Sequence, residues 1–178
     1  MAKKLCGPRV WVELRYYVGQ IKQADNDKLY AEQRAFIARQ KSRDTRISFH
    51  MGRMERRVAS DGAARELAAY VATHSTTLDA PTQTDLSAIV SQHANVVIHV
   101  EKAVDVMLAV DLVVLAEQGA YDTAYVLSAD GDFTPAAAYV RSKGKKMFAA
   151  SASSGAELAK AVDSFIRLRP DWVNDCYI

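Results

Sequence analysis

Two aspartates separated by one glycine, Asp130 and Asp132, are the residues of this sequence best placed to do chemistry. They follow an apolar run of strand-like composition over residues 123–127 and precede a helical pattern that starts near Phe133. Gly131 lets the backbone turn sharply enough for both carboxylates to face one space. Hard divalent cations prefer oxygen ligands of this kind. The motif indicates a metal site or, on the plainer interpretation, aspartates that cap the following helix.

A third acid lies in a similar position after another apolar strand. Residues 101–112 have helical composition, so Asp105 falls in the first turn, where the helix dipole favours a carboxylate. Asp111 comes six residues later, about two-thirds of a rotation further round the helix, which favours a supporting or structural role. We therefore expect Asp105, Asp130 and Asp132 to converge at the C-terminal edge of a sheet, where open α/β folds bind their ligands.

Strand-like and helical segments alternate along the chain. The patterns predict strands over residues 9–18, 46–54, 95–100, 123–127 and 145–150. They predict helices after the capping cluster at 25–27 and over 63–73, 86–92, 101–112, 136–141 and 153–166, with a loop over 75–85. Such alternation implies right-handed crossovers. The expected fold is a three-layer α/β fold, a mostly parallel sheet with helices on both faces, in one domain of residues 1–178.

Composition and charge narrow the class of protein. The chain is 49% hydrophobic and 25% charged, as in soluble globular proteins. Residues 1–60 hold 14 lysines and arginines against 6 acids, a balance of +8, and the remainder holds 9 against 15, a balance of −6. This asymmetry suits a protein that binds a polyanion with one part and metal ions with the other. No apolar run is long enough to cross a bilayer, so we expect a cytoplasmic protein without a membrane partner.

Several motifs together resemble the NYN-domain family of PIN-like nucleases, in particular its bacterial LabA-like branch. The matching segments are Glu101-Lys-Ala-Val-Asp-Val with Asp111, Tyr121-Asp122, Ser128-Ala-Asp-Gly-Asp-Phe-Thr-Pro135 and Gly144-Lys145. Their order and spacing agree with the family across residues 95–168, which makes the combination more specific than any one motif. Alanine replaces the family's glycine at Ala103 and Ala129, and we expect both turns to survive this change.

The resemblance implies a metal-dependent endoribonuclease that hydrolyses RNA phosphodiester bonds. One or two Mg²⁺ or Mn²⁺ ions would activate a water and stabilise the leaving oxygen. The residues that match the family's catalytic and metal-binding acids are Asp105, Asp130 and Asp132. Ser128, Asp111 and Lys102 are expected to support them.

One departure from the family concerns its first strand. The family begins with a short strand that bears an aspartate, whereas this sequence starts at what resembles the second strand, so the N-terminal strand is expected to be missing. A truncated reading frame, a sheet that closes up and a strand supplied by another chain all remain open. The strands near 9–18 and 123–129 would each lose a neighbour, which favours a homodimer through an exposed strand edge. The loss of the family's first aspartate would remove one metal ligand, so we expect weakened cleavage.

Two other functions stay open. A catalytically weak or inactive module of the same fold could bind RNA or a protein through its basic half, at Arg39, Lys41, Arg43, Arg46, Arg53, Arg56 and Arg57. An unrelated Mg²⁺-dependent phosphoryl-transfer enzyme is the third interpretation, because an Asp-x-Asp turn after a strand recurs by convergence.

Overall fold

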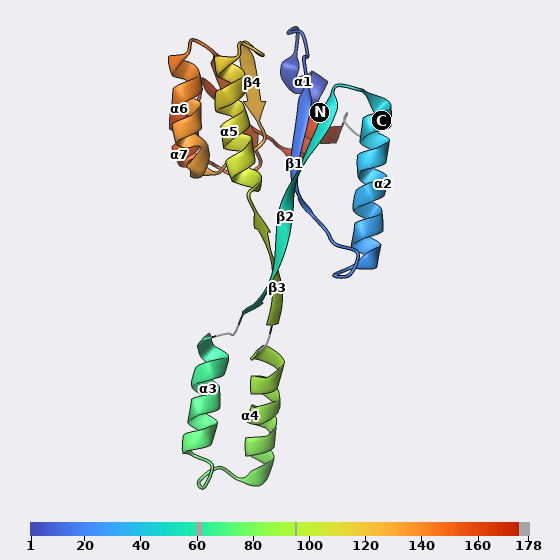
Figure 1. Ribbon diagram of the computed structural model, residues 1–178. Coiled ribbons are helices and arrows are strands. Elements are labelled where there is room, and N and C mark those ends of the chain that lie inside the picture. The colour runs from blue at the N-terminus through green and yellow to red at the C-terminus, as the bar shows by residue number, and fades with distance from the viewer. Residues whose placement is uncertain (60–61, 95, 175–178) are drawn as a thin grey trace. The chain divides into compact units, whose positions relative to one another are not determined.

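The strands are divided between two three-stranded sheets (Figure 1). The structure is a computed structural model that describes residues 1–59, 62–94 and 96–174. In chain order the elements are α1 (Ala2–Cys6), β1 (Leu14–Gln20), α2 (Asp27–Arg43), β2 (Ile47–Ala59), α3 (Gly62–Thr73), α4 (Ala80–His93), β3 (Val96–Lys102), α5 (Val104–Glu117), β4 (Thr123–Val126), the 3-10 helix η1 (Gly131–Phe133), α6 (Thr134–Ser142), β5 (Lys146–Ser151), α7 (Ala156–Ala161), β6 (Ser164–Arg167) and α8 (Pro170–Val173).

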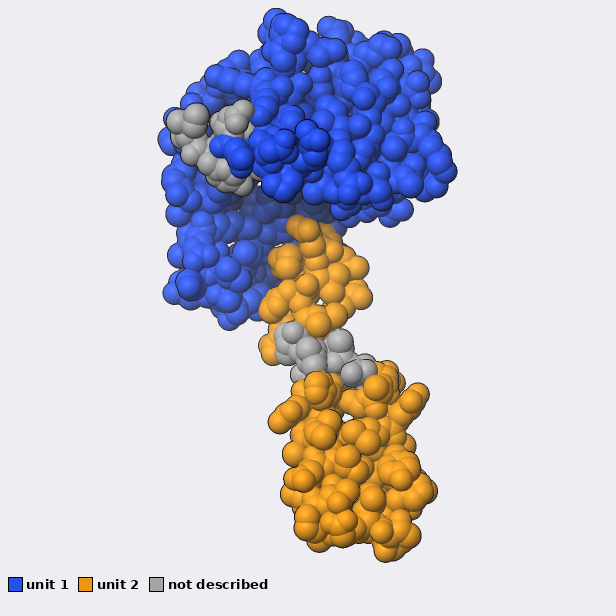
Figure 2. Space-filling model, turned by 180° about the vertical axis from the view of Figure 1, so that it is seen from behind, with its two compact units in different colours: residues 1–53, 103–178 blue, residues 54–102 orange. Residues whose placement is uncertain are grey.

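The chain forms two compact units, coloured separately in Figure 2. The larger unit contains residues 1–53 and 103–178, and the smaller contains residues 54–102. The smaller unit holds the end of β2, the strand β3 and the helices α3 and α4, which pack against each other. All the candidate acids belong to the larger unit.

The first sheet has the strand order β1-β2-β3 and is mixed. β1 and β2 run parallel, with Tyr16 opposite Phe49 in the register. These two rings stack at 4.9 Å between centroids, and Phe36 of α2 meets both edge-on. No described residue of α2 is buried, and Phe36 connects this helix to the two stacked rings of the sheet.

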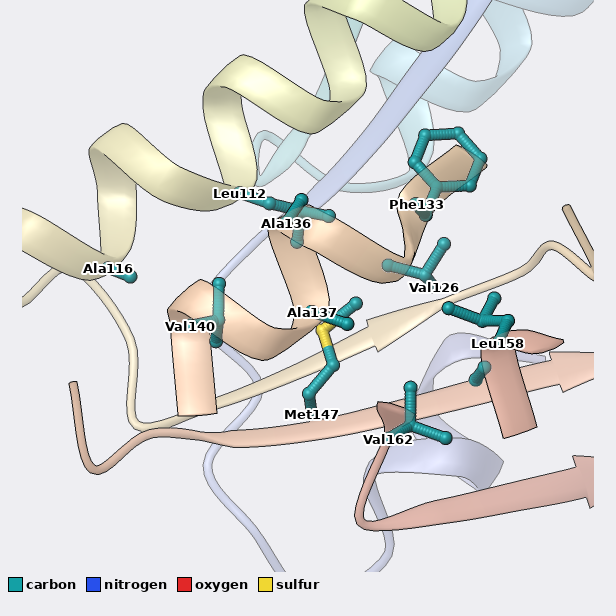
Figure 3. Packing of buried hydrophobic residues seen from close by; sticks show 11 residues of the cluster. Leu112, Ala116, Val126, Phe133, Ala136, Ala137, Val140, Met147, Leu158 and Val162 are labelled. Carbon is teal, nitrogen blue, oxygen red and sulfur yellow. The ribbon is translucent and has the colours of Figure 1, made fainter. Parts of the chain in front are cut away.

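The second sheet, β4-β5-β6, is parallel and carries the densest core. Side chains from α5, β4, α6, β5 and α7 meet on one of its faces, as Figure 3 shows. Val140, Met147 and Leu158 are fully buried there. The proposed acidic motif therefore follows a strand that is anchored in a well-packed core.

The α/β class is confirmed, but the expectation of one continuous sheet is wrong, because the strands separate into two sheets. Among the described residues, β1 and β4 each pair with a strand on one side only. The loop predicted over 75–85 is also wrong beyond Asp79. This residue caps α4 by accepting a hydrogen bond from the backbone N–H of Thr82 at 3.0 Å, and Pro81 occupies the first turn.

The helix predicted over 153–166 is wrong in its second half. α7 ends at Ala161, and Phe165 and Ile166 belong to β6, where they pair with β5. Their apolar spacing fits a helix and a short strand equally well, which explains the error. The predicted helix after the cluster at 25–27 is confirmed, with Asn26 as its cap.

The predicted strand over 95–100 is present as β3, although residue 95 lies outside the described residues. The expected Ala103 turn is also confirmed, because this residue adopts a left-handed conformation with φ of 71°. Within the described ranges, no helix combines the length and the apolar character that a bilayer span requires.

Candidate active site

The turn after β4 is built by its own polar side chains. The backbone N–H of Asp130 donates to Ser128 Oγ at 3.0 Å, and the N–H of Asp132 donates to Asp130 Oδ1 at 2.9 Å. Asp130 is thereby the cap of η1, so the capping interpretation is confirmed. Both aspartate side chains remain exposed to solvent. Capping and ligand binding are compatible, because the cap uses one oxygen of a carboxylate that has two.

A hollow of about 500 Å³ opens beside Asp132. It is lined by Gly131, Asp132, Thr134, Pro135 and Glu157. A Cβ atom on Gly131 would lie 3.3 Å from Glu157 Cβ, so the turn requires a small residue where α7 approaches it. Thr134 Oγ1 is buried without a hydrogen-bond partner among the described residues. Sequence reasoning singled out neither Thr134 nor Glu157 as a site residue, and Glu157 stands in no motif that could have revealed it.

Asp105 occupies the first turn of α5, as expected, and its side chain is exposed. The left-handed Ala103 precedes the helix and turns the chain out of β3. The helix dipole favours a negative charge at this position. The exposed side chain of Asp105 is therefore accessible to a ligand.

The turn offers oxygen donors that suit a divalent cation, but the described residues form no complete set of metal ligands. Asp130 and Asp132 offer carboxylate oxygens from one turn, which is the donor type that Mg²⁺ and Mn²⁺ prefer. Across residues 1–59, 62–94 and 96–174, however, no group of three His, Cys, Asp or Glu side chains could hold a metal ion. Convergence of Asp105 with the turn stays a prediction.

Asp111 takes part in a polar network on the β1–β2 sheet. Its Oδ2 accepts hydrogen bonds from Arg15 Nη1 at 2.8 Å and from the Tyr17 hydroxyl at 2.7 Å. His50 Nδ1 lies 3.8 Å from the same oxygen. Arg15 also donates a hydrogen bond from Nε to Glu13 Oε2 at 2.8 Å. Partial burial alone would raise the pKa of Asp111, but the hydrogen bonds from Tyr17 and Arg15 outweigh it and hold that pKa below its ordinary value. Asp111 thus links α5 to β1 through these two hydrogen bonds.

The other expected supporting residues lie in different surroundings. Ser128 shapes the turn, as described above. Lys102 is the last residue of β3 and belongs to the smaller unit.

The basic residues expected to bind RNA are not equally available. Arg46 donates two hydrogen bonds to the Asp44 carboxylate, from Nε at 2.9 Å and from Nη2 at 2.7 Å. Its guanidinium carbon lies 4.1 Å from the centroid of the Trp11 ring. Hydrogen bonds from Arg46 lower the pKa of Asp44 to about 2. Arg39 and Arg43 lie on α2, where their side chains are exposed. The exposed arginines of α2 are therefore freer to meet a polyanion than Arg46.

The comparison with protein families agrees with the motifs. The NYN domain matches residues 16–169, so the chain belongs to the NYN-domain family, which is part of the PIN-like ribonucleases. No curated protein and no solved structure matches the chain significantly. The match covers both compact units.

Proposed function

We propose that the chain is a metal-dependent endoribonuclease that hydrolyses RNA phosphodiester bonds. The observation that carries the proposal is the pair of exposed carboxylates, Asp130 and Asp132, held on one capped turn beside a hollow. Mg²⁺ commonly binds through one or two carboxylates together with substrate phosphates, so a closed three-carboxylate cage is not required before RNA binds. Mg²⁺ or Mn²⁺ would supply charge stabilisation at the scissile phosphate.

The residues proposed to act are those that the family resemblance implies. Asp105, Asp130 and Asp132 are the catalytic and metal-binding acids, Ser128 holds the turn, and Asp111 and Lys102 support the site. The exposed arginines of α2 supply the positive charge that draws in the RNA backbone. We also propose that residues 1–178 act as a single domain, supported by a family match that runs through both units, and that the protein works in the cytoplasm.

A binding module of the same fold is the second candidate. The observation that favours it is the lack of a ready three-ligand metal group among the described residues. The one-sided pairing of β1 and β4 also keeps open the proposal of a homodimer through a strand edge.

Incubating the full chain with end-labelled single-stranded RNA, in Mn²⁺, in Mg²⁺ and in excess EDTA, separates the two candidates. A nuclease gives internal cleavage with either metal and none in EDTA. Binding without cleavage under every condition would support the module instead. Cleavage that persists in EDTA would exclude the proposed chemistry.

A further inference from the structure

An apolar groove lies between α5 and α6, next to the proposed site. It encloses about 380 Å³ and is lined by Ala109, Val110, Val113, Val114, Pro135, Ala136 and Tyr139. Several of its side chains are large and open to solvent, with Val110 51% and Tyr139 38% exposed. Figure 1 shows the two helices side by side. Such a surface costs free energy in water unless a ligand covers it.

Pro135 joins this groove to the acidic hollow, because it lines both. Asp132 lies in η1, three residues before Pro135 in the first turn of α6, and Tyr139 follows Pro135 one turn later on the same helix. A ligand held at Asp132 could therefore extend directly into the groove. Among the residues that the structure describes, no Lys or Arg lines the groove itself, which disfavours a phosphate as its occupant.

Tyr139 offers a positioned aromatic ring to the groove. The hydroxyl of Tyr139 donates to Glu117, and Lys143 Nζ lies 5.1 Å from the ring centroid. Lys143 also pairs with Glu117 at 2.7 Å. The ring is thus held in place by its polar end while part of its surface stays open. Flat apolar ligands, and nucleobases above all, stack on such rings.

We propose that this groove is a nucleobase subsite, which takes an unpaired base next to the phosphate held at the acidic turn. This inference rests on the proposed function for the position of the phosphate. A base inside a duplex cannot enter, because only an unstacked, single-stranded base can be turned into an apolar pocket. The subsite therefore requires an unpaired base at the position in the bound RNA that reaches the groove.

The test measures equilibrium binding of a fluorescent single-stranded oligoribonucleotide to the full chain in Ca²⁺, a hard cation that can bind carboxylate and phosphate oxygens together, and gel electrophoresis checks that the strand stays intact. Tyr139→Ala should weaken binding about 5- to 150-fold, which corresponds to the loss of one stacked base. Val110→Ser, at an exposed groove position, should weaken it in the same direction. Tyr139→Phe keeps the ring but loses the hydroxyl that donates to Glu117, so it should bind more tightly than Tyr139→Ala. Tyr70→Ala removes a comparably exposed tyrosine, 51% against 38%, outside the groove and should have no effect.

An abasic strand of the same length decides whether the base is what the groove recognises. The wild type should bind the abasic strand as weakly as the Tyr139→Ala variant binds the normal strand. On the abasic strand, Tyr139→Ala should cause no further loss of affinity. An equal loss for both strands, or no loss for either, would overturn the subsite. Because cleavage is not measured, the result stands apart from the nuclease proposal: an inactive protein that passes this test keeps the subsite, and an active one that fails loses it.

Discussion

At the level of single residues, one carboxylate was better understood from the structure than from the sequence. Asp111 looked like a secondary member of an acidic motif, and the helical period alone separated it from Asp105. Its partners, Arg15 and Tyr17, lie more than ninety positions earlier in the chain. No local pattern predicts a contact of that separation, so the sequence could indicate the role of Asp111 but not the residues that create it.

The network around Asp111 predicts a pH-dependent stability. Asp111→Asn should lower the free energy of unfolding at pH 7 by about 1–3 kcal/mol, because hydrogen bonds to a charged group are lost. The folded-state pKa of Asp111 is depressed, so its contribution is present above the unfolded-state value of about 3.9 and is lost as the pH falls below it. Urea unfolding at pH 7 and pH 3 should show the gap between variant and wild type narrowing. A gap of equal size at both pH values would contradict this account.

Ala103 is strained by its left-handed backbone, with φ of 71°. The family's glycine would adopt this conformation without strain. Ala103→Gly should therefore stabilise the protein by about 0.5–1 kcal/mol, the net of relieved strain and added chain entropy. Thermal unfolding of the two proteins checks this, and a lower melting temperature for the variant would show that the turn bears no strain.

Among the elements, the short helix α7 and its surroundings set the position of the acidic turn. Gly155, the residue before α7, has φ of 50°, and a Cβ atom there would lie 2.7 Å from Phe165 and 3.1 Å from the Ala129 backbone. Sequence patterns merged α7 with β6, because apolar spacing over so few residues does not separate helix from strand. The longer helix α2 was predicted because its cap and its apolar period are both visible in the sequence. The helix predicted over 101–112 is present as α5 but displaced, because residues 101–102 belong to β3 and the helix extends to Glu117.

Gly155→Ala should destabilise the protein by about 2–4 kcal/mol, since it adds a clash to the cost of a left-handed alanine. Gly144→Ala is the matched control, because it also has a positive φ, of 74°, but no atom within 4 Å of the added Cβ. It should cost only about 1–2 kcal/mol. Chemical unfolding of both variants measures the difference in unfolding free energy. Equal losses of stability would contradict the predicted clash with Phe165 and Ala129.

For the whole molecule, alternation of strands and helices correctly predicted the α/β class, while the division into two sheets was missed. Periodicity identifies a strand but not its neighbours, because pairing depends on contacts distant in sequence. The motifs that indicate the family are short and local, so they could be recognised from the sequence alone. They extend over residues 95–168, within the matched range of 16–169. What could not be predicted is the surroundings of the acids, including Glu157, Thr134 and the apolar groove.

The central claim is that the charge of the capped turn drives metal-dependent RNA cleavage. Asp130→Asn tests it most directly, because asparagine caps a helix as well as aspartate does and only the charge is removed. We predict unchanged folding stability and a fall in the Mn²⁺-dependent cleavage rate of single-stranded RNA on the order of 100-fold or more, the usual scale for removing one electrostatic stabiliser from an active site. A variant that folds normally and cleaves RNA at the wild-type rate would contradict the account.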